Sequence, residues 1–234
     1  MKFSSLLWRI GAGGSRGKLS GKALFDLVRP YTMVDDLRLS SLENLTNEVC
    51  KAGVRGDIVE CGVYNGGSAA IPASVIKPLG ERCLWLYDTF EGIPAAGPLD
   101  GSLAVRHTGD FRGQVERVKE VFNKADFPLE RIVFRKGLFQ DTFKEPFPQK
   151  VALLHIDADW YESVLHALRT FYPRVSDGGV IILDDFGYWE GARRAFYAFC
   201  REFSVEPLLE RVGYTQAFWL KGKEHNRNTQ GEVG

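Results

Sequence analysis

The sequence has no apolar run of the about 18 residues that a membrane-spanning helix needs. Residues 1–10 have a short apolar centre that Arg9 interrupts, without the core and cleavage site of a signal peptide. The four cysteines follow no zinc-binding spacing, and Cys61 and Cys83 lie in or beside expected core strands. Buried reduced thiols of this kind indicate a cytoplasmic protein.

The chain also lacks an excess of charge of either sign. Lys and Arg together number 30, and so do Asp and Glu. A neutral chain offers no long-range attraction to a polyanion, so we expect no nucleic-acid partner. With 234 residues, 44% of them hydrophobic, the chain is long enough for one domain with a substantial core.

The most informative stretch is 151–185, where two apolar runs of strand length each end in a pair of carboxylates. Asp157 and Asp159 follow the first run, and Asp184 and Asp185 follow the second. Apolar residues recur at helical spacing between the runs, so the stretch predicts a strand, a helix and a second, parallel strand. All four carboxylates then reach one edge of the sheet, where open α/β folds bind ligands.

Four carboxylates at one edge repel one another unless a cation neutralises them. Mg²⁺ accepts carboxylate oxygens and keeps open positions for water or substrate. The alternative is that Asp184 and Asp185 are ordinary capping or turn residues. Because two such pairs follow consecutive buried strands, we favour a metal site.

A glycine-rich turn joins an expected strand over 57–62 to an apolar helix over 69–76. Glycines let a backbone approach a ligand, and a helix N-terminus offers unpaired N–H groups, so the turn is a candidate anion or nucleotide cradle. The spacing Gly62-x-x-x-Gly66-Gly67 matches neither the dinucleotide fingerprint nor a P-loop. Taken alone, the turn therefore leaves a purely structural role open.

The next expected strand, 83–88, ends in an acid. An acid at the end of a second strand can accept hydrogen bonds from both ribose hydroxyls of a nucleoside. The alternative role for Asp88 is to cap the following turn over 89–92. The glycine-rich turn just upstream favours the ribose.

The remaining segments complete an α/β pattern. Helices are expected over residues 22–28, 37–49, 111–124 and 191–203. A third strand is expected over 131–137, and two further strands over 205–212 and 215–220 are expected to form a closing hairpin. The loop 93–109 is a candidate lid, in which His107 is expected to be solvent-exposed. Arg193 and Arg194 are expected on a solvated face, although either could reach an acidic substrate.

Together these segments resemble the class I methyltransferase fold. This is an α/β, Rossmann-like fold with a seven-stranded, mostly parallel sheet, a C-terminal antiparallel hairpin and helices on both faces. The resemblance implies a methyltransferase domain over 30–222, while composition predicts an N-terminal arm over 1–29 and a disordered tail over 223–234.

The motifs narrow the resemblance to the macrocin O-methyltransferase family. They are the segments 31–34, 37–39, 56–68, 88–92, 155–163 and 172–185. The resemblance covers about residues 30–220, and the Asp-x-Asp…Asp-Asp set is its most specific part. The family includes enzymes that methylate sugar hydroxyls of macrolide and aminocoumarin antibiotics.

The resemblance implies S-adenosylmethionine and Mg²⁺ as cofactors, and a small-molecule or glycan acceptor with a free hydroxyl. It assigns to the cofactor Glu60, Gly62, Tyr64, Gly66, Gly67, Ser68, Asp88, Phe90, Gly137 and Asp157. It assigns Mg²⁺ to Asp157, Asp184 and Asp185, and the role of general base to Asp159. Coordination would lower the pKa of a sugar hydroxyl, and Asp159 would take its proton during in-line transfer of the methyl group.

Two other functions compete with this interpretation. The first is a nicotinamide-dependent oxidoreductase, and the spacing of the glycine-rich turn argues against it. The second is a non-catalytic cofactor-binding protein, and the presence of all four aspartates argues against that. Family members often carry extra N-terminal length for oligomerisation or substrate closure, and this chain is short there. The sequence therefore leaves open the acceptor, the hydroxyl that is methylated and whether the chain forms a homo-oligomer.

Overall fold

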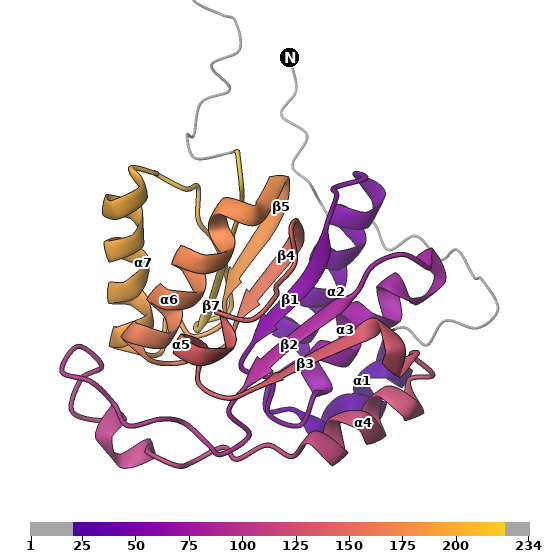
Figure 1. Ribbon diagram of the computed structural model, residues 1–234, viewed down its shortest axis with the longest axis horizontal. Coiled ribbons are helices and arrows are strands. Elements are labelled where there is room, and N and C mark those ends of the chain that lie inside the picture. Colours follow the sequence, from indigo (N-terminus) through magenta and orange to yellow (C-terminus); the bar gives the residue numbers. More distant parts are fainter. Residues whose placement is uncertain (1–20, 223–234) are drawn as a thin grey trace, which may run out of the picture.

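A seven-stranded sheet forms the centre of the computed structural model, which describes residues 21–222 (Figure 1). The strands are β1 Asp57–Cys61, β2 Leu84–Asp88, β3 Ile132–Lys136, β4 Val151–Ile156, β5 Val175–Leu183, β6 Glu210–Val212 and β7 Gln216–Leu220. Their order is β3-β2-β1-β4-β5-β7-β6, with β1 to β5 parallel and β7 antiparallel to both neighbours. The fold class predicted from the sequence is therefore confirmed, while most of the expected arm and the expected tail lie outside the described residues.

Helices cover both faces of the sheet (Figure 1). One face carries α1 Lys22–Val28, α2 Asp36–Lys51, α3 Gly67–Ile76 and α4 Val115–Lys124. The other carries α5 Phe139–Thr142, α6 Tyr161–Phe171 and α7 Glu190–Phe203. Among these described helices, none combines the length and the apolar composition that crossing a bilayer requires.

The apolar runs of the sequence become strands because both of their faces are covered. Every residue of β4 is buried, and its apolar side chains are divided between the two cores. Leu153 packs on the side of α1 to α4, and Leu154 packs on the side of α5 to α7. Such runs are typical of central parallel strands.

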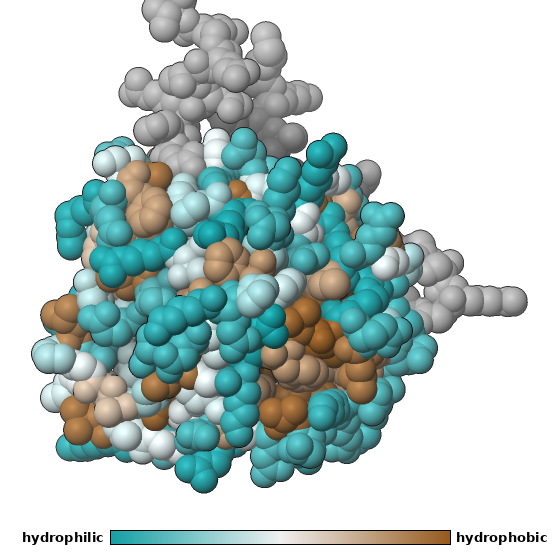
Figure 2. Space-filling view, in the orientation of Figure 1, coloured by the Kyte–Doolittle hydropathy of each residue, from teal (hydrophilic) through white to brown (hydrophobic). Residues whose placement is uncertain are grey.

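The edge strand β3 is less covered than the centre of the sheet. Only Ile132 of its five residues is buried. In the space-filling view, apolar side chains gather on the otherwise mainly hydrophilic face where Figure 1 places β2 and β3 (Figure 2). The acids thus follow the central strands β4 and β5, which are more deeply buried than the edge strand β3.

Two expected boundaries were wrong for local reasons. Helix α4 begins at Val115 and not at 111, because Phe111 has a φ of 55° and the backbone at Gly113 packs against the Tyr64 carbonyl. Strand β6 begins at Glu210 and not at 205. Pro207, which has no N–H to donate to a ladder, lies in the irregular segment before it.

Candidate functional site

A cavity of about 1090 Å³ lies where the parallel strands end. Its wall includes eight residues that the sequence assigned to the site: Gly62, Tyr64, Ser68, Asp88, Asp157, Asp159, Asp184 and Asp185. The assigned residues that do not line it are Glu60, Gly66, Gly67, Phe90 and Gly137. The two aspartate pairs and the glycine-rich turn thus share one cavity, as the topology requires.

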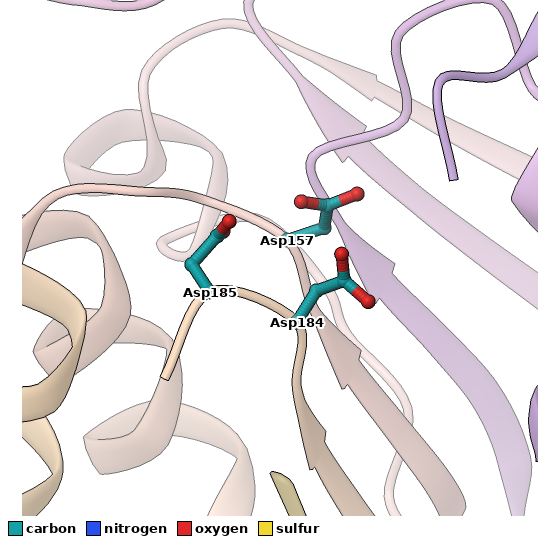
Figure 3. Close-up of side chains that lie close together, drawn as sticks. All are labelled: Asp157, Asp184 and Asp185. Atoms are coloured by element: carbon teal, nitrogen blue, oxygen red, sulfur yellow. The ribbon is translucent and has the colours of Figure 1, made fainter. Parts of the chain in front are cut away.

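Asp157, Asp184 and Asp185 converge at the ends of β4 and β5 (Figure 3). One carboxylate oxygen from each lies within 4.8 Å of the other two. Burial raises the pKa of Asp157 and of Asp185 well above the ordinary value, and neighbouring carboxylates raise both further. An all-oxygen set of crowded carboxylates suits a hard divalent cation, so these residues fit Mg²⁺.

Asp184 differs from its two neighbours because protein donors already hold it. Gln216 Nε2 donates to its Oδ1 at 2.8 Å, and the Arg38 guanidinium binds its Oδ2. Burial opposes its ionisation, but His155, Arg38 and Gln216 outweigh burial and keep the pKa of Asp184 below the ordinary value. Asp184 is therefore the carboxylate of the trio that stays charged without a cation.

Arg38 is a further residue of the site that the sequence patterns did not predict. It lies in the first turn of α2, where Asp35 is the N-cap and accepts both the Arg38 backbone N–H at 3.0 Å and its Nε at 2.8 Å. The same arginine then reaches Asp184, 146 residues further along the chain. Arg38 lies within the motif segment 37–39, and that position was the one feature of the sequence that could have indicated a role in the site.

A row of buried polar side chains runs beneath the cavity. Ser68 Oγ donates to Glu60 Oε1 at 2.6 Å, and His155 Nδ1 lies 3.5 Å from that oxygen. On its other side, His155 Nε2 lies 3.7 Å from Asp184 Oδ1. Burial disfavours a charged imidazole, but the two carboxylates outweigh burial and raise the pKa of His155 well above the ordinary value. Glu60, 1% exposed, thus lies under the cavity wall and connects the glycine-rich turn to the aspartates.

The glycine-rich turn is shaped by close contacts and by Asp88. Gly62 has a φ of 89°, and a Cβ there would lie 1.7 Å from the Asp157 carbonyl oxygen, so only glycine fits. Asp88 Oδ2 accepts the N–H groups of Val63 at 2.7 Å and Tyr64 at 2.9 Å. Its Oδ1 accepts the N–H of Phe90 at 2.7 Å. Asp88 therefore braces the turn from β2 while facing the cavity.

Replacing Asp88 with alanine is expected to weaken binding of S-adenosylhomocysteine and to lower Tm. The change leaves three backbone N–H groups without their acceptor, and each unsatisfied buried group costs about 1–3 kcal/mol. Calorimetry and thermal melting measure the two effects, with exposed Asp177→Ala as the matched control. An unchanged Kd for S-adenosylhomocysteine in Asp88→Ala would remove Asp88 from the cofactor site.

Asp159 stands beside the trio in a conformation that few residues adopt. Its φ is 55°, in the left-handed region, and its N–H donates to Asp185 Oδ2 at 3.3 Å. The Trp189 side chain favours the charged form of its carboxylate. Burial and the nearby charge of Asp157 nevertheless raise the pKa of Asp159 to about 8. This carboxylate can therefore accept a proton near neutral pH.

Without a divalent cation, the protein is expected to lose stability as pH rises. Asp159 binds its proton with a pKa of about 8 in the folded state, far above the unfolded value. The folded state then holds more protons than the unfolded state, so the free energy of unfolding falls as pH passes through the folded pKa. The Tm of chelator-treated protein should fall from about pH 6 to about pH 9.

Two comparisons isolate this effect. Mg²⁺ should restore Tm more at the higher pH, because metal ligands bind in their deprotonated form. Asp159→Asn should flatten the loss of Tm relative to the exposed control Asp177→Asn. A chelator-treated protein whose Tm rises over the same pH range would contradict the raised carboxyl pKa values.

The loop 93–110 forms one side of the cavity, and one of its residues, His107, was expected to face solvent. His107 lines the cavity, with its ring edge-on to Trp189 at a centroid distance of 5.2 Å. Arg193 and Arg194 are outside the cavity lining and donate to the carbonyls of Phe186 at 3.2 Å and Leu99 at 2.8 Å. Among described residues, Arg38 is thus the one arginine or lysine of the lining.

The outer part of the cavity is apolar. Its exposed lining residues include Met33, Phe111, Leu138 and Tyr188. The acids of the lining are Asp88, Asp100, Asp157, Asp159, Glu162, Asp184 and Asp185. A ligand therefore meets an apolar entrance and an acidic interior.

Comparisons with known proteins agree with this arrangement. The family model for macrocin-O-methyltransferase (TylF) matches residues 26–221. The 8-demethyl-8-(2,3-dimethoxy-alpha-L-rhamnosyl)-tetracenomycin-C 4'-O-methyltransferase of Streptomyces olivaceus is 31% identical, over 86% of this chain and 79% of that protein. The demethyldecarbamoylnovobiocin O-methyltransferase of Streptomyces niveus is 29% identical, over 82% and 76%.

Solved structures give the same fold. The O-methyltransferase NovP has a TM-score of 0.76 at 28% identity, with 82% of each chain covered. The S-adenosylhomocysteine-bound methyltransferase PaMTH1 of Podospora anserina has a TM-score of 0.59 at 16% identity, over 86% of this chain and 88% of that chain. At that identity the second likeness concerns the fold alone.

Proposed function

The chain belongs to the macrocin O-methyltransferase family, and from this premise we propose that it methylates a sugar hydroxyl of a neutral small molecule. It is an S-adenosylmethionine-dependent O-methyltransferase. In the proposed mechanism, Asp157, Asp184 and Asp185 hold Mg²⁺, and Asp159 is the general base.

The observation that carries the proposal is the shared cavity. Three carboxylates have oxygens within 4.8 Å of one another, and Asp159, with a pKa of about 8, lies beside them. The turn braced by Asp88 lines the same cavity. This arrangement supports a mechanism in which cofactor, metal and base act on one hydroxyl.

Each residue group has one task in this mechanism. When bound, Mg²⁺ supplies positive charge that lowers the pKa of the acceptor hydroxyl. Asp159 would take the hydroxyl proton as the oxygen bonds to the methyl carbon of S-adenosylmethionine and the carbon–sulfur bond breaks, which leaves S-adenosylhomocysteine. Asp88 keeps the turn over 62–68 in the shape that holds the cofactor, and in-line alignment supplies much of the remaining rate.

The cavity lining supports a neutral acceptor. The two curated relatives described above are named for a rhamnosyl-bearing tetracenomycin and for a novobiocin precursor. Here the apolar entrance suits an apolar aglycone. Among the described lining residues, Arg38 is the one arginine or lysine that a phosphate could meet, and Asp35 and Asp184 already bind it. A nucleoside diphosphate sugar would place its phosphates among carboxylates, so we propose that the sugar is already attached to its neutral aglycone.

Transfer of a labelled methyl group from S-adenosylmethionine tests the proposal. The panel pairs neutral glycosides with apolar aglycones against the matching nucleoside diphosphate sugars and free sugars. Turnover is expected with the glycosides and with added Mg²⁺. Calorimetry with S-adenosylhomocysteine and with NAD runs beside it, and binding of NAD alone would favour an oxidoreductase instead.

A further inference from the structure

Asp100 is a buried carboxylate that the proposed chemistry does not use. It lies in the loop 93–110 and is 3% exposed. Its Oδ1 accepts the N–H of Tyr161 at 2.6 Å, and its Oδ2 accepts the N–H of Gly97 at 2.7 Å. Tyr161 is the first residue of α6, where the partial positive charge of a helix N-terminus favours a carboxylate. One side chain therefore ties the loop to α6.

The same carboxylate also lies against the start of α7. A Cβ on Gly191, the second residue of that helix, would lie 2.0 Å from Asp100 Oδ1. The carboxylate thus occupies a notch that only glycine leaves open. Arg194 adds a second connection, because its Nη1 donates to the Leu99 carbonyl of the loop at 2.8 Å. Asp100 consequently lies between the first turns of both helices.

The N-caps of these two helices are tryptophans. Trp160 precedes α6 and Trp189 precedes α7, and their rings meet edge to face with centroids 4.9 Å apart. Trp160 Nε1 donates to the Pro94 carbonyl of the loop at 2.8 Å. Trp160 directly follows Asp159 in the chain, and Trp189 lines the same cavity as Asp159. The position of Asp159 therefore depends on where the two helices start.

We propose that Asp100 is a positioning residue for methyl transfer. Its carboxylate joins the loop 93–110 to the first turns of α6 and α7, and thereby holds Trp160 and Trp189 in place beside Asp159. The inference rests on the proposed function, in which Asp159 is the general base. Releasing the loop would let the indole pair shift, and a misplacement of about 1 Å at a catalytic group can cost about 10²-fold in rate.

Two variants disturb this contact from opposite sides. Asp100→Asn keeps the shape but turns an amide N–H₂ toward one of the backbone N–H groups, so one hydrogen bond is lost. Gly191→Ala keeps Asp100 and fills the notch, while alanine favours the helical conformation of α7 more than glycine does. If both act on one contact, the double variant should be no slower than the slower single variant. Ser102→Ala, an exposed residue of the same loop, is the control.

The readout is the set of indole N–H resonances in ¹H–¹⁵N spectra of the full chain, assigned with Trp→Phe variants. Both Asp100→Asn and Gly191→Ala are expected to shift the resonances of Trp160 and Trp189. The resonance of Trp85, whose indole donates to Asp57 at 2.8 Å, should stay in place. In the same samples kcat should fall about 10- to 100-fold, with the Kd for S-adenosylhomocysteine unchanged.

Two results would overturn the proposal. In the first, the Trp160 and Trp189 resonances stay in place in both variants. In the second, they shift but kcat equals that of the wild type, which would make Asp100 a merely structural residue. A wild-type protein that transfers no methyl group would refute the proposed function, whereas the resonances would still decide whether Asp100 holds Trp189.

Discussion

Replacing Asp159 with asparagine is expected to lower kcat for methyl transfer about 10²- to 10⁴-fold, the usual cost of losing a general base. Asparagine keeps the size of the side chain, and it tolerates the left-handed backbone that Asp159 adopts at a φ of 55°. The carboxylate, with its pKa of about 8, is lost as a proton acceptor. The fold and the metal ligands remain in place.

The measurement is kcat against Mg²⁺ concentration, with the Kd for Mg²⁺ and for S-adenosylhomocysteine determined by calorimetry. Both dissociation constants should match those of the wild type. Asp177→Asn, the same change at an exposed position of β5, is the control and should leave kcat unchanged. A fully active Asp159→Asn would mean that solvent takes the proton and that Asp159 is not the base.

Removing the divalent cation is expected to abolish turnover, and added Mg²⁺ should restore it. The three carboxylates of Asp157, Asp184 and Asp185 face one another, and burial together with mutual repulsion raises the pKa of the first and the last. A bound cation relieves that repulsion and supplies the charge that activates the hydroxyl. Rates measured after exhaustive chelation and after Mg²⁺ is returned give the result.

Asp157→Asn separates a metal ligand from the base. It should weaken the Kd for Mg²⁺ at least about 10-fold, as changes around metal ligands commonly do, and excess Mg²⁺ should partly restore kcat. Rescue of Asp159→Asn by excess Mg²⁺, without rescue of Asp157→Asn, would reverse the two roles. Full activity after exhaustive chelation would show that the assignment of Mg²⁺ to this site is wrong.

The succession of strands and helices could be predicted because each leaves a local pattern. Apolar runs of strand length and apolar residues at helical spacing follow one another through 151–185, and β4, α6 and β5 occupy that stretch. The meeting of Asp157 with Asp184 and Asp185 followed from topology alone, because neighbouring parallel strands end at one sheet edge.

Local patterns gave less information where the strands stop. Strand β4 ends at Ile156, so strand alternation does not place Asp157 relative to Asp159. The left-handed turn at Asp159 sets its direction instead. Likewise, Asp88 looked like a ribose ligand or a local cap, whereas it also braces the turn after β1, at Val63 and Tyr64.

The sequence by itself therefore determined the fold class, the family and the aspartates that meet at the sheet edge. Only the tertiary structure decided which distant polar groups form hydrogen bonds and ion pairs with the residues of the site. Arg38 reaches Asp184 across 146 residues, and Asp100 reaches the N-terminus of α6 across 61. Neither contact could be predicted from a periodicity or from the spacing of a motif in the sequence. A buried polar side chain takes whichever donor or acceptor the packing brings within hydrogen-bond distance, and that partner exists only once the chain has folded.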